Sequence, residues 1–251
     1  MTRTAARSVL LCSALLLAGL IGSSCSLRPQ PEPPPVDPGP VIDADLLTAT
    51  PTSPSAMVSG SIQGAPGASP AGALLRAYNL ESTVAPAEAV VASDGSFSLF
   101  LDVLEDDEVR LELIAEGVRS KPLDVIIGHE ASVPILASRA LADCLSIAPA
   151  LQLDLGRVGA AVVDRTIVIA NGCSFDVTVG AVGMRAPVDG LTVVPEAPTP
   201  SSISSGASST VLIRYEAPGG VTGAMDDVLL IEVVAPQRDR RPVTIFAEVG
   251  P

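Results

Sequence analysis

Residues 93–101, SDGSFSLFL, place a turn signal directly before a strict alternation of side chains. In an extended chain, Phe97, Leu99 and Leu101 share one face, and the residues between them share the other. The Asp-Gly pair near the start suits a tight hairpin, because glycine adopts a positive φ without steric cost. The stretch therefore predicts a β-strand entered through a sharp turn, and not a helix.

The same punctuation recurs on both sides of this stretch. Val109, Leu111 and Leu113 again alternate with the residues between them. Short apolar runs separated by Gly, Pro, Asp and Ser clusters predict seven strands, at 57–62, 73–80, 88–93, 96–101, 109–116, 122–127 and 131–136. Strands of this length and spacing are typical of an antiparallel β-sandwich, which we assign to residues 56–139.

Residues 140–251 show a second series of short apolar runs. Strands are predicted at 145–148, 151–155, 161–170, 175–184, 191–194, 209–215, 228–234 and 243–249, with Gly-, Pro- and Asp-rich turns between them. The fold class expected for the whole chain is all-β. It consists of two tandem immunoglobulin-like antiparallel β-sandwiches, preceded by a signal peptide and a Pro-rich tether.

Each half also resembles a known domain family. Val58–Ile62 and Ala92–Leu99 resemble the carboxypeptidase regulatory-like (transthyretin-like) domain, in which an Asp-Gly-Ser-Phe turn joins two strands of a seven-stranded sandwich. Blocks in the second half resemble the abnormal-spindle/hydin-like immunoglobulin fold, whose bacterial surface repeats carry the choice-of-anchor label: 153–158, 165–173, 213–215 and 227–231. Both resemblances imply modules that act as stalks, spacers or binding units.

The first 26 residues carry the features of an export signal. Arg3 and Arg7 precede an apolar run from Val9 to Ile21, which is too short to cross a bilayer as a helix. Small residues then lead to Cys25, and this arrangement resembles the lipobox of bacterial lipoproteins. The resemblance implies removal of residues 1–24 and attachment of a lipid to the Cys25 sulfur. The alternative is an ordinary secretory signal that leaves Cys25 free.

Residues 25–55 are rich in proline, and we expect them to form a tether. Prolines at this density favour the extended polyproline II conformation, with a rise of about 3.1 Å per residue. Residues 41–47 are slightly more apolar and could dock onto the first sandwich. The expected role of the tether is to hold the folded part away from a membrane.

Composition limits the classes of partner. The chain of 251 residues is 47% hydrophobic, has no Trp, and carries a formal net charge of −13. Such a surface repels nucleic acid and anionic lipid headgroups, so direct electrostatic contact with either is not expected. The lack of Trp and the scarcity of Tyr also count against a sugar-binding face, since sugars are bound by stacking on aromatic rings.

Four cysteines reduce to one pair once Cys12 of the signal and Cys25 are set aside. The remaining Cys144 and Cys173 are expected to form a structural disulfide in an oxidising compartment, worth about 3–4 kcal/mol in the chain-entropy model. The alternatives are two free thiols or a metal site. A zinc site needs four ligands, and His129 is the single histidine, so no metal and no cofactor are expected.

Three further features are candidate sites. His129 lies beside Glu130 in a predicted turn, and we expect an exposed histidine there rather than half of a catalytic pair. The four acids at 105–108 are expected to form a solvated loop, and the two at 226–227 a strand start, with weak calcium binding as the alternative for both. The sequence has no recognised catalytic motif, so no catalytic residues are assigned and no enzyme is expected.

Together these features predict a non-enzymatic lipoprotein of a bacterial cell envelope. It would serve as a membrane-tethered spacer and protein-interaction module in a surface assembly, with an envelope protein as partner. Ser26 after the anchor cysteine, where sorting rules of lipoproteins place Asp for retention, favours the outer membrane. The alternative is a carbohydrate- or ligand-binding surface protein.

Overall fold

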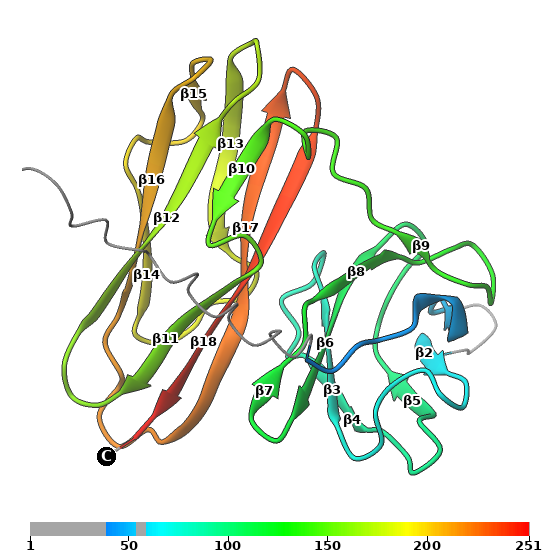
Figure 1. Ribbon diagram of the computed structural model, residues 1–251. Helices are drawn as coiled ribbons and strands as arrows, with labels where there is room; N and C mark the ends of the chain where they lie inside the picture. The colour runs from blue at the N-terminus through cyan, green and yellow to red at the C-terminus, as the bar shows by residue number, and fades with distance from the viewer. Residues whose placement is uncertain (1–38, 54–58, 251) are drawn as a thin grey trace, which may run out of the picture. The chain divides into compact units, whose positions relative to one another are not determined.

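The computed structural model describes residues 39–53 and 59–250 (Figure 1). Strands dominate these residues, and the helical structure among them is one short 3-10 turn, η1 (Ala44–Leu46). The strands form four sheets, which pack as two sandwiches with separate cores. The prediction of an all-β chain with tandem immunoglobulin-like sandwiches is confirmed.

The first sandwich packs a three-stranded sheet against a larger one. The smaller sheet has the order β1 (Leu47–Thr50), β2 (Ser61–Gly64), β5 (Phe97–Phe100). The larger has the order β4 (Ala87–Val90), β3 (Leu74–Asn79), β6 (Glu108–Ala115), β8 (Leu123–Ile126), β9 (Ile135–Leu136), with β7 (Val118–Arg119) beside β6. Alternate residues of the facing strands fill the core, among them Ile62, Leu75, Leu99 and Leu111.

The folded part begins earlier than predicted. β1 lies within the segment assigned to the tether, and it pairs antiparallel with β2 from Leu47 opposite Gly64 to Thr50 opposite Ser61. Leu47 and Ala49 are fully buried in the core. The tether prediction for 25–55 was therefore wrong from β1 onward, because this short alternating segment completes a sheet. Residues 25–38 of the tether lie outside the described residues.

The turn before β5 exists, but it does not form a hairpin within one sheet. Gly95 has a φ of 84°, and a Cβ atom there would lie 2.7 Å from the Ser69 carbonyl oxygen, so glycine is required. The turn is closed by the Ala92 N–H, which donates to the Ser96 carbonyl (2.8 Å). The strands that it joins, β4 and β5, belong to different sheets. The hairpin prediction was wrong because the chain crosses between the layers here.

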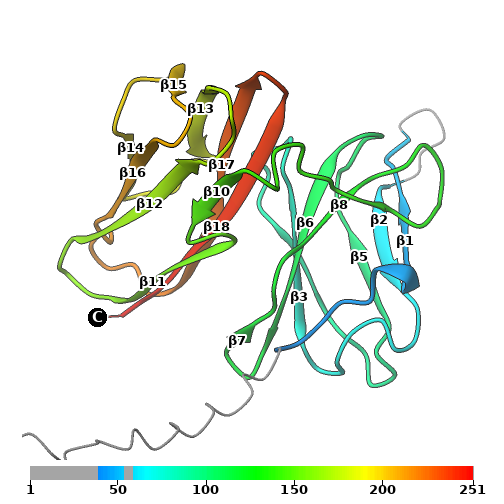
Figure 2. The ribbon, with the colours of Figure 1, turned by 45° about the horizontal axis from the view of Figure 1, so that its top comes forward.

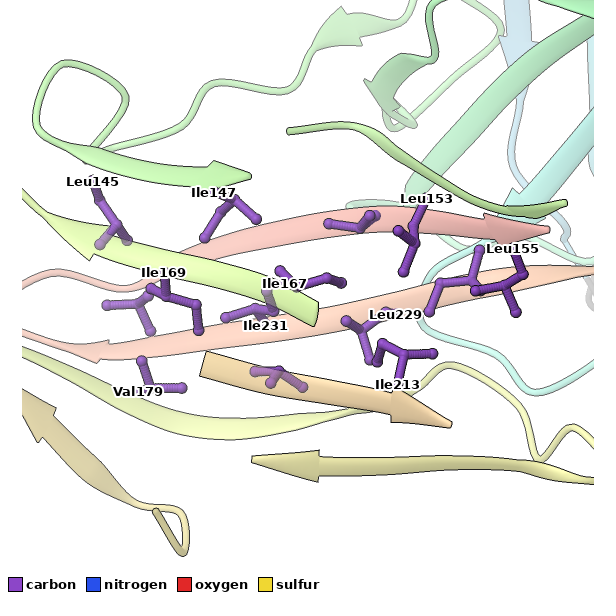
Figure 3. Packing of buried hydrophobic residues seen from close by; sticks show 14 of the residues in the cluster. Leu145, Ile147, Leu153, Leu155, Ile167, Ile169, Val179, Ile213, Leu229 and Ile231 are labelled. Carbon is purple, nitrogen blue, oxygen red and sulfur yellow. The ribbon is translucent and has the colours of Figure 1, made fainter. Parts of the chain in front are cut away.

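The second sandwich has sheets of four and five strands. One has the order β10 (Leu145–Ala148), β12 (Val163–Asn171), β16 (Ser208–Tyr215), β14 (Leu191–Pro195). The other has the order β11 (Gln152–Val158), β18 (Asp239–Val249), β17 (Gly223–Ala235), β13 (Val177–Met184), β15 (Ser201–Ile203). Figure 3 shows Leu153, Ile167, Ile213 and Leu229 pointing into the space between the sheets.

Three details of the second sandwich differ from the prediction. β11 pairs parallel with β18, so one sheet is mixed. β15 was not predicted, and it is a three-residue edge strand that pairs with β13. β17 and β18 are also longer than expected, because they form one continuous hairpin from Gly223 opposite Val249 to Val233 opposite Asp239.

Cys144 and Cys173 form a disulfide, as predicted. Cys144 directly precedes β10, and Cys173 follows β12, with which β10 pairs. The two Cα atoms lie 4.7 Å apart. Because the two cysteines sit at the same end of adjacent strands, the bridge fixes the edge of the sheet.

Candidate functional site

The predicted site residues are scattered over the chain. Cys25 lies outside the described residues. His129 is exposed in a loop, as predicted, and its Nδ1 lies 2.5 Å from a Glu105 carboxylate oxygen. The hydrogen bond and the charge of Glu105 raise the pKa of His129 above its ordinary value.

The acidic cluster at 105–108 divides between the loop and the strand. The Asp107 carboxylate accepts hydrogen bonds from the Leu104 N–H (2.8 Å) and the Asn79 side-chain amide (2.9 Å). Glu108 is the first residue of β6, is buried, and accepts from Arg139 (2.5 Å). The prediction of a solvated loop was wrong for Glu108, since it pairs with arginine inside the protein. Within residues 39–53 and 59–250, no group of three or more His, Cys, Asp and Glu residues is placed to hold a metal ion.

A set of arginines dominates the polar interior instead. They link β3, β6 and β7 of the first sandwich to β17, β18 and nearby loops of the second. We call this set the arginine seam, and define it by five arginines with their carboxylate, carbonyl and hydroxyl partners: Arg76, Arg110, Arg119, Arg185 and Arg240.

Arg110 is the most buried member of the seam, with none of its surface exposed. Its guanidinium group donates two hydrogen bonds to the Asp124 carboxylate, at 2.7 and 2.9 Å. Its Nη1 also donates to the Leu151 carbonyl (3.1 Å) and the Thr244 hydroxyl (3.2 Å) of the second sandwich. The Thr244 hydroxyl in turn donates to Glu112, two residues along β6.

Asp226 is the acidic centre of a second part of the seam. Its carboxylate pairs with Arg119 of β7 (2.6 Å) and with Arg76 of β3. Arg119 also donates to Glu112 (3.0 Å), and its guanidinium carbon lies 4.2 Å from the centre of the Phe246 ring. Both arginine partners of the buried Asp226 carboxylate therefore come from the first sandwich.

Arg185 and Arg240 make the reverse connection, from the second sandwich to the first. Arg185 donates two bonds to Asp227 (2.8 and 2.9 Å) and further bonds to the Ser82 and Val84 carbonyls (2.5 and 2.7 Å). Arg240 donates to Glu232 of its own sandwich (2.6 Å) and also pairs with Glu81. The acids at 226–227 were predicted as a strand start, with weak calcium binding as the alternative. They lie inside β17, which begins at Gly223, and both pair with arginines.

The surroundings of Asp124 and Tyr78 shift the pKa values of both side chains. Burial by itself would raise the pKa of Asp124, but the guanidinium groups of Arg110 and Arg139 bring it below its ordinary value. Burial, followed by the charge of Glu112, raises the pKa of Tyr78, which lies beneath the Arg185 guanidinium. Since a carboxylate held by guanidinium is a weak base, the seam has the chemistry of a structural joint rather than of an acid–base site.

Sequence reasoning missed the seam, although a signal for it was present. β6 carries Arg110 and Glu112 among apolar residues, and both faces of this strand are buried. In addition, Lys121 is the single lysine in a chain with 15 basic residues. Arginine is favoured over lysine for buried and bidentate ion pairs, so this bias pointed to internal pairing.

No family model matches the chain, and no curated protein matches it. Among solved structures, the chain is similar to a protein of unknown function from Porphyromonas gingivalis W83, with 14% identity, a TM-score of 0.36, and coverage of 84% of this chain and 100% of that one. It is also similar to the ASH/PapD-like domain 7 of human CEP192 (10% identity, TM-score 0.37, 45% and 90% covered). A third is the Vibrio cholerae VesB protease, with 12% identity, a TM-score of 0.35, and coverage of 70% of this chain and 62% of that one. At TM-scores this low, the likenesses carry no argument about activity.

In the part of the chain that the structure describes, no helix has the length and apolarity needed to span a membrane.

Proposed function

We propose that the chain is a non-enzymatic envelope lipoprotein that serves as a membrane-tethered spacer and protein-interaction module. The observation that carries the spacer part is the arginine seam. Arg110, with none of its surface exposed, uses one guanidinium group to bond to both sandwiches. A joint of this kind makes the two sandwiches move as one body.

The physical argument compares this joint with an ordinary domain interface. Interfaces between domains of one chain commonly allow relative motion unless they are large and apolar. In the seam, separation would strip Arg185 from the Ser82 and Val84 carbonyls and Asp226 from both of its arginines. Loss of a partner is costly for a buried charge, and this cost favours a rigid spacer over two sandwiches joined by a flexible connection.

The anchor part of the proposal rests on the resemblance of the Cys25 region to a lipobox. Its test is membrane fractionation of the full chain expressed in its own bacterium. Cys25→Ala should move the protein from the membrane to the soluble envelope fraction. Cys12→Ala is the matched control, since it removes a thiol from the signal and should leave retention unchanged. Retention of the Cys25→Ala protein would contradict lipid anchoring.

The interaction part of the proposal needs a partner. Chemical crosslinking of the full chain in intact envelopes, followed by affinity capture, should yield one discrete envelope protein in stoichiometric amount. The same purified protein is applied to a glycan array. Glycan binding without a protein partner would replace this proposal with the carbohydrate-binding alternative.

The non-enzymatic part is supported by how the titratable groups are used. Glu112 and Asp124 are held by guanidinium groups, and the exposed His129 is engaged with Glu105. None of these carboxylates is free to act as a general base.

A further inference from the structure

The edge of β5 carries none of the features that block strand addition at β14 and β11. β5 ends its sheet, pairs only with β2, and contains neither a charge nor a proline. The edge strand β14 ends at Pro195, and β11 carries charges and a register irregularity. Natural proteins use such features to block the addition of foreign strands, so their absence at β5 is informative.

The backbone of β5 offers a defined set of hydrogen-bonding groups. The Leu101 N–H donates to the Gly60 carbonyl of the adjoining strand (3.2 Å). Bonded pairs alternate in an antiparallel ladder, so Leu99 and Phe97 also direct their backbone groups toward β2. Ser98 and Phe100 therefore direct their N–H and C=O groups to the open side.

The pairing of β2 with β1 provides an independent check of which residues of β5 direct their backbone groups outward. The Ala65 N–H donates to the Leu46 carbonyl (2.9 Å), so Ser61 and Gln63 of β2 face β1 with their backbone groups. The residues between them, Ile62 and Gly64, must then face β5. The backbone groups of Ser98 and Phe100 therefore point away from β2, to the open side of β5. Figure 2 shows β1, β2 and β5 side by side in one layer.

A surface groove includes part of the β5 edge. This groove, of about 510 Å³, extends from Thr48 of β1 across Gln63 of β2 to Ser98 of β5, and Val90 and Ala92 border it beyond β5. Val90 and Phe100 are each 69% exposed, the highest fraction among the large apolar residues that the structure describes. The inward residues of β4, Ala87 and Ala89, are only half-buried, because the three-stranded sheet stops short of them.

Charges at the ends of β5 define the occupant further. Asp94 lies just before the strand and Asp102 just after it, and both are exposed. The residues that line the groove carry no charge. In a chain with a net charge of −13, this leaves two acidic ends around a neutral, partly apolar slot. A basic residue at each end of an added strand complements this pattern.

We propose that the free edge of β5 binds an extended segment of a partner protein, which adds as a fourth strand to the β1–β2–β5 sheet. The segment alternates apolar and polar residues and carries Arg or Lys at both ends. Its backbone bonds to Ser98 and Phe100, and its apolar side chains cover Phe100 and Val90. The proposal rests on the proposed role as a protein-interaction module, and it adds the location of the site and the class of partner.

The first test places a photo-crosslinking amino acid at Phe100 of the full chain in the native envelope, with a second version at Val194. Val194 is an exposed residue of the edge strand β14 and serves as the matched control. The Phe100 position should crosslink to one protein, at an extended segment with basic ends, and the Val194 position should not. Crosslinking to a partner from Val194 but not from Phe100 would refute the β5 site while leaving the interaction role intact. No partner from chemical crosslinking or from either position would refute the interaction role itself.

The second test examines the strand geometry. Ser98→Pro removes a backbone donor on the open side, where proline is tolerated in an edge strand, and should reduce crosslinking more than tenfold. Val193→Pro is the matched control on β14. The Glu196 N–H donates to the Thr210 carbonyl of β16, and bonded residues alternate along an antiparallel strand. The Val193 N–H therefore points to the open side of β14, as the Ser98 N–H does on β5. Unchanged crosslinking by a folded Ser98→Pro protein would overturn the proposal.

The third test leaves the protein unaltered. The crosslinked segment is synthesised in two N-methylated forms. In one form, the methyl groups replace the backbone N–H groups that face β5; in the other, they replace those that face away from β5. Only the form with its bonding edge blocked should lose binding, by at least tenfold. Equal binding of the two forms would exclude strand addition.

Discussion

Replacing Arg110 by Met is the most direct test of the arginine seam. Methionine keeps much of the volume of the side chain and removes the charge. The change deletes two bonds to Asp124 and those to Leu151 and Thr244. It also leaves Asp124, whose side chain is 13% exposed, with Arg139 as its remaining guanidinium partner, at 2.6 Å.

The expected loss follows from these contacts. Removing one partner of a buried ion pair costs about 3–5 kcal/mol, because the other charge stays buried. Arg139 still compensates Asp124, so we expect a loss near the lower end, about 3 kcal/mol. In urea unfolding, this loss appears as a lower midpoint with little change in the slope.

The control is Arg214→Met, which breaks the exposed pair with Asp164 on the surface of the second sandwich. Water and salt screen such a pair, so the control should unfold at nearly the wild-type midpoint. If Arg110→Met loses no more stability than Arg214→Met, the claim that the seam holds the sandwiches together is refuted.

Three further predictions concern the turn, the titration and the disulfide. Gly95→Ala should lower the free energy of unfolding by about 1–3 kcal/mol in thermal melts, because it combines a positive φ with a clash against the Ser69 carbonyl. Gly72→Ala is the control and should cost less, because Gly72 also has a positive φ but has open space around it. The pKa of Asp124 is lowered in the folded protein. Its contribution to stability is therefore present above the ordinary pKa of 3.8 and is lost as the pH falls through the lower folded pKa. Asp124→Asn should make the free energy of unfolding depend less on pH in this acidic range. Replacing both Cys144 and Cys173 by Ser should cost about 3 kcal/mol in urea unfolding, and reduction of the wild-type protein should produce the same loss, while a reductant that further destabilises the double variant would contradict the assignment.

Alternation predicted the strands well where one face meets the core and the other meets water. β5 and β10 lie within a residue or two of their predicted bounds, since both show a regular buried–exposed pattern. β15 was missed because a three-residue strand of Ser, Ser and Ile gives no periodic signal. β1 was missed because it follows a proline-rich segment whose composition hid the apolar pair Leu47 and Ala49.

The disulfide could be predicted by counting cysteines, whereas the seam could not be predicted by local pattern. The partners of Arg110 lie 14 to 134 residues away in the chain, at Asp124 and Thr244. No periodicity within one strand indicates which acid will meet which arginine over such separations. The edge of β5 presents the same difficulty, because only the order of strands in the sheet shows that its outer side is open.

The parallel pairing of β11 with β18 has a consequence for the order in which the chain acquires its structure. β11 is made almost a hundred residues before β18, yet β18 is the strand between it and the rest of its sheet. Until β18 emerges from the ribosome or the export channel, β11 has no neighbour in that sheet. Thr244 and Phe246, which meet Arg110 and Arg119, arrive on the same late strand. Until then, Arg110 and Arg119 keep Asp124 and Glu112 of the first sandwich as partners, and a chain cut short before β18 would lose both the β11 pairing and these contacts to the second sandwich.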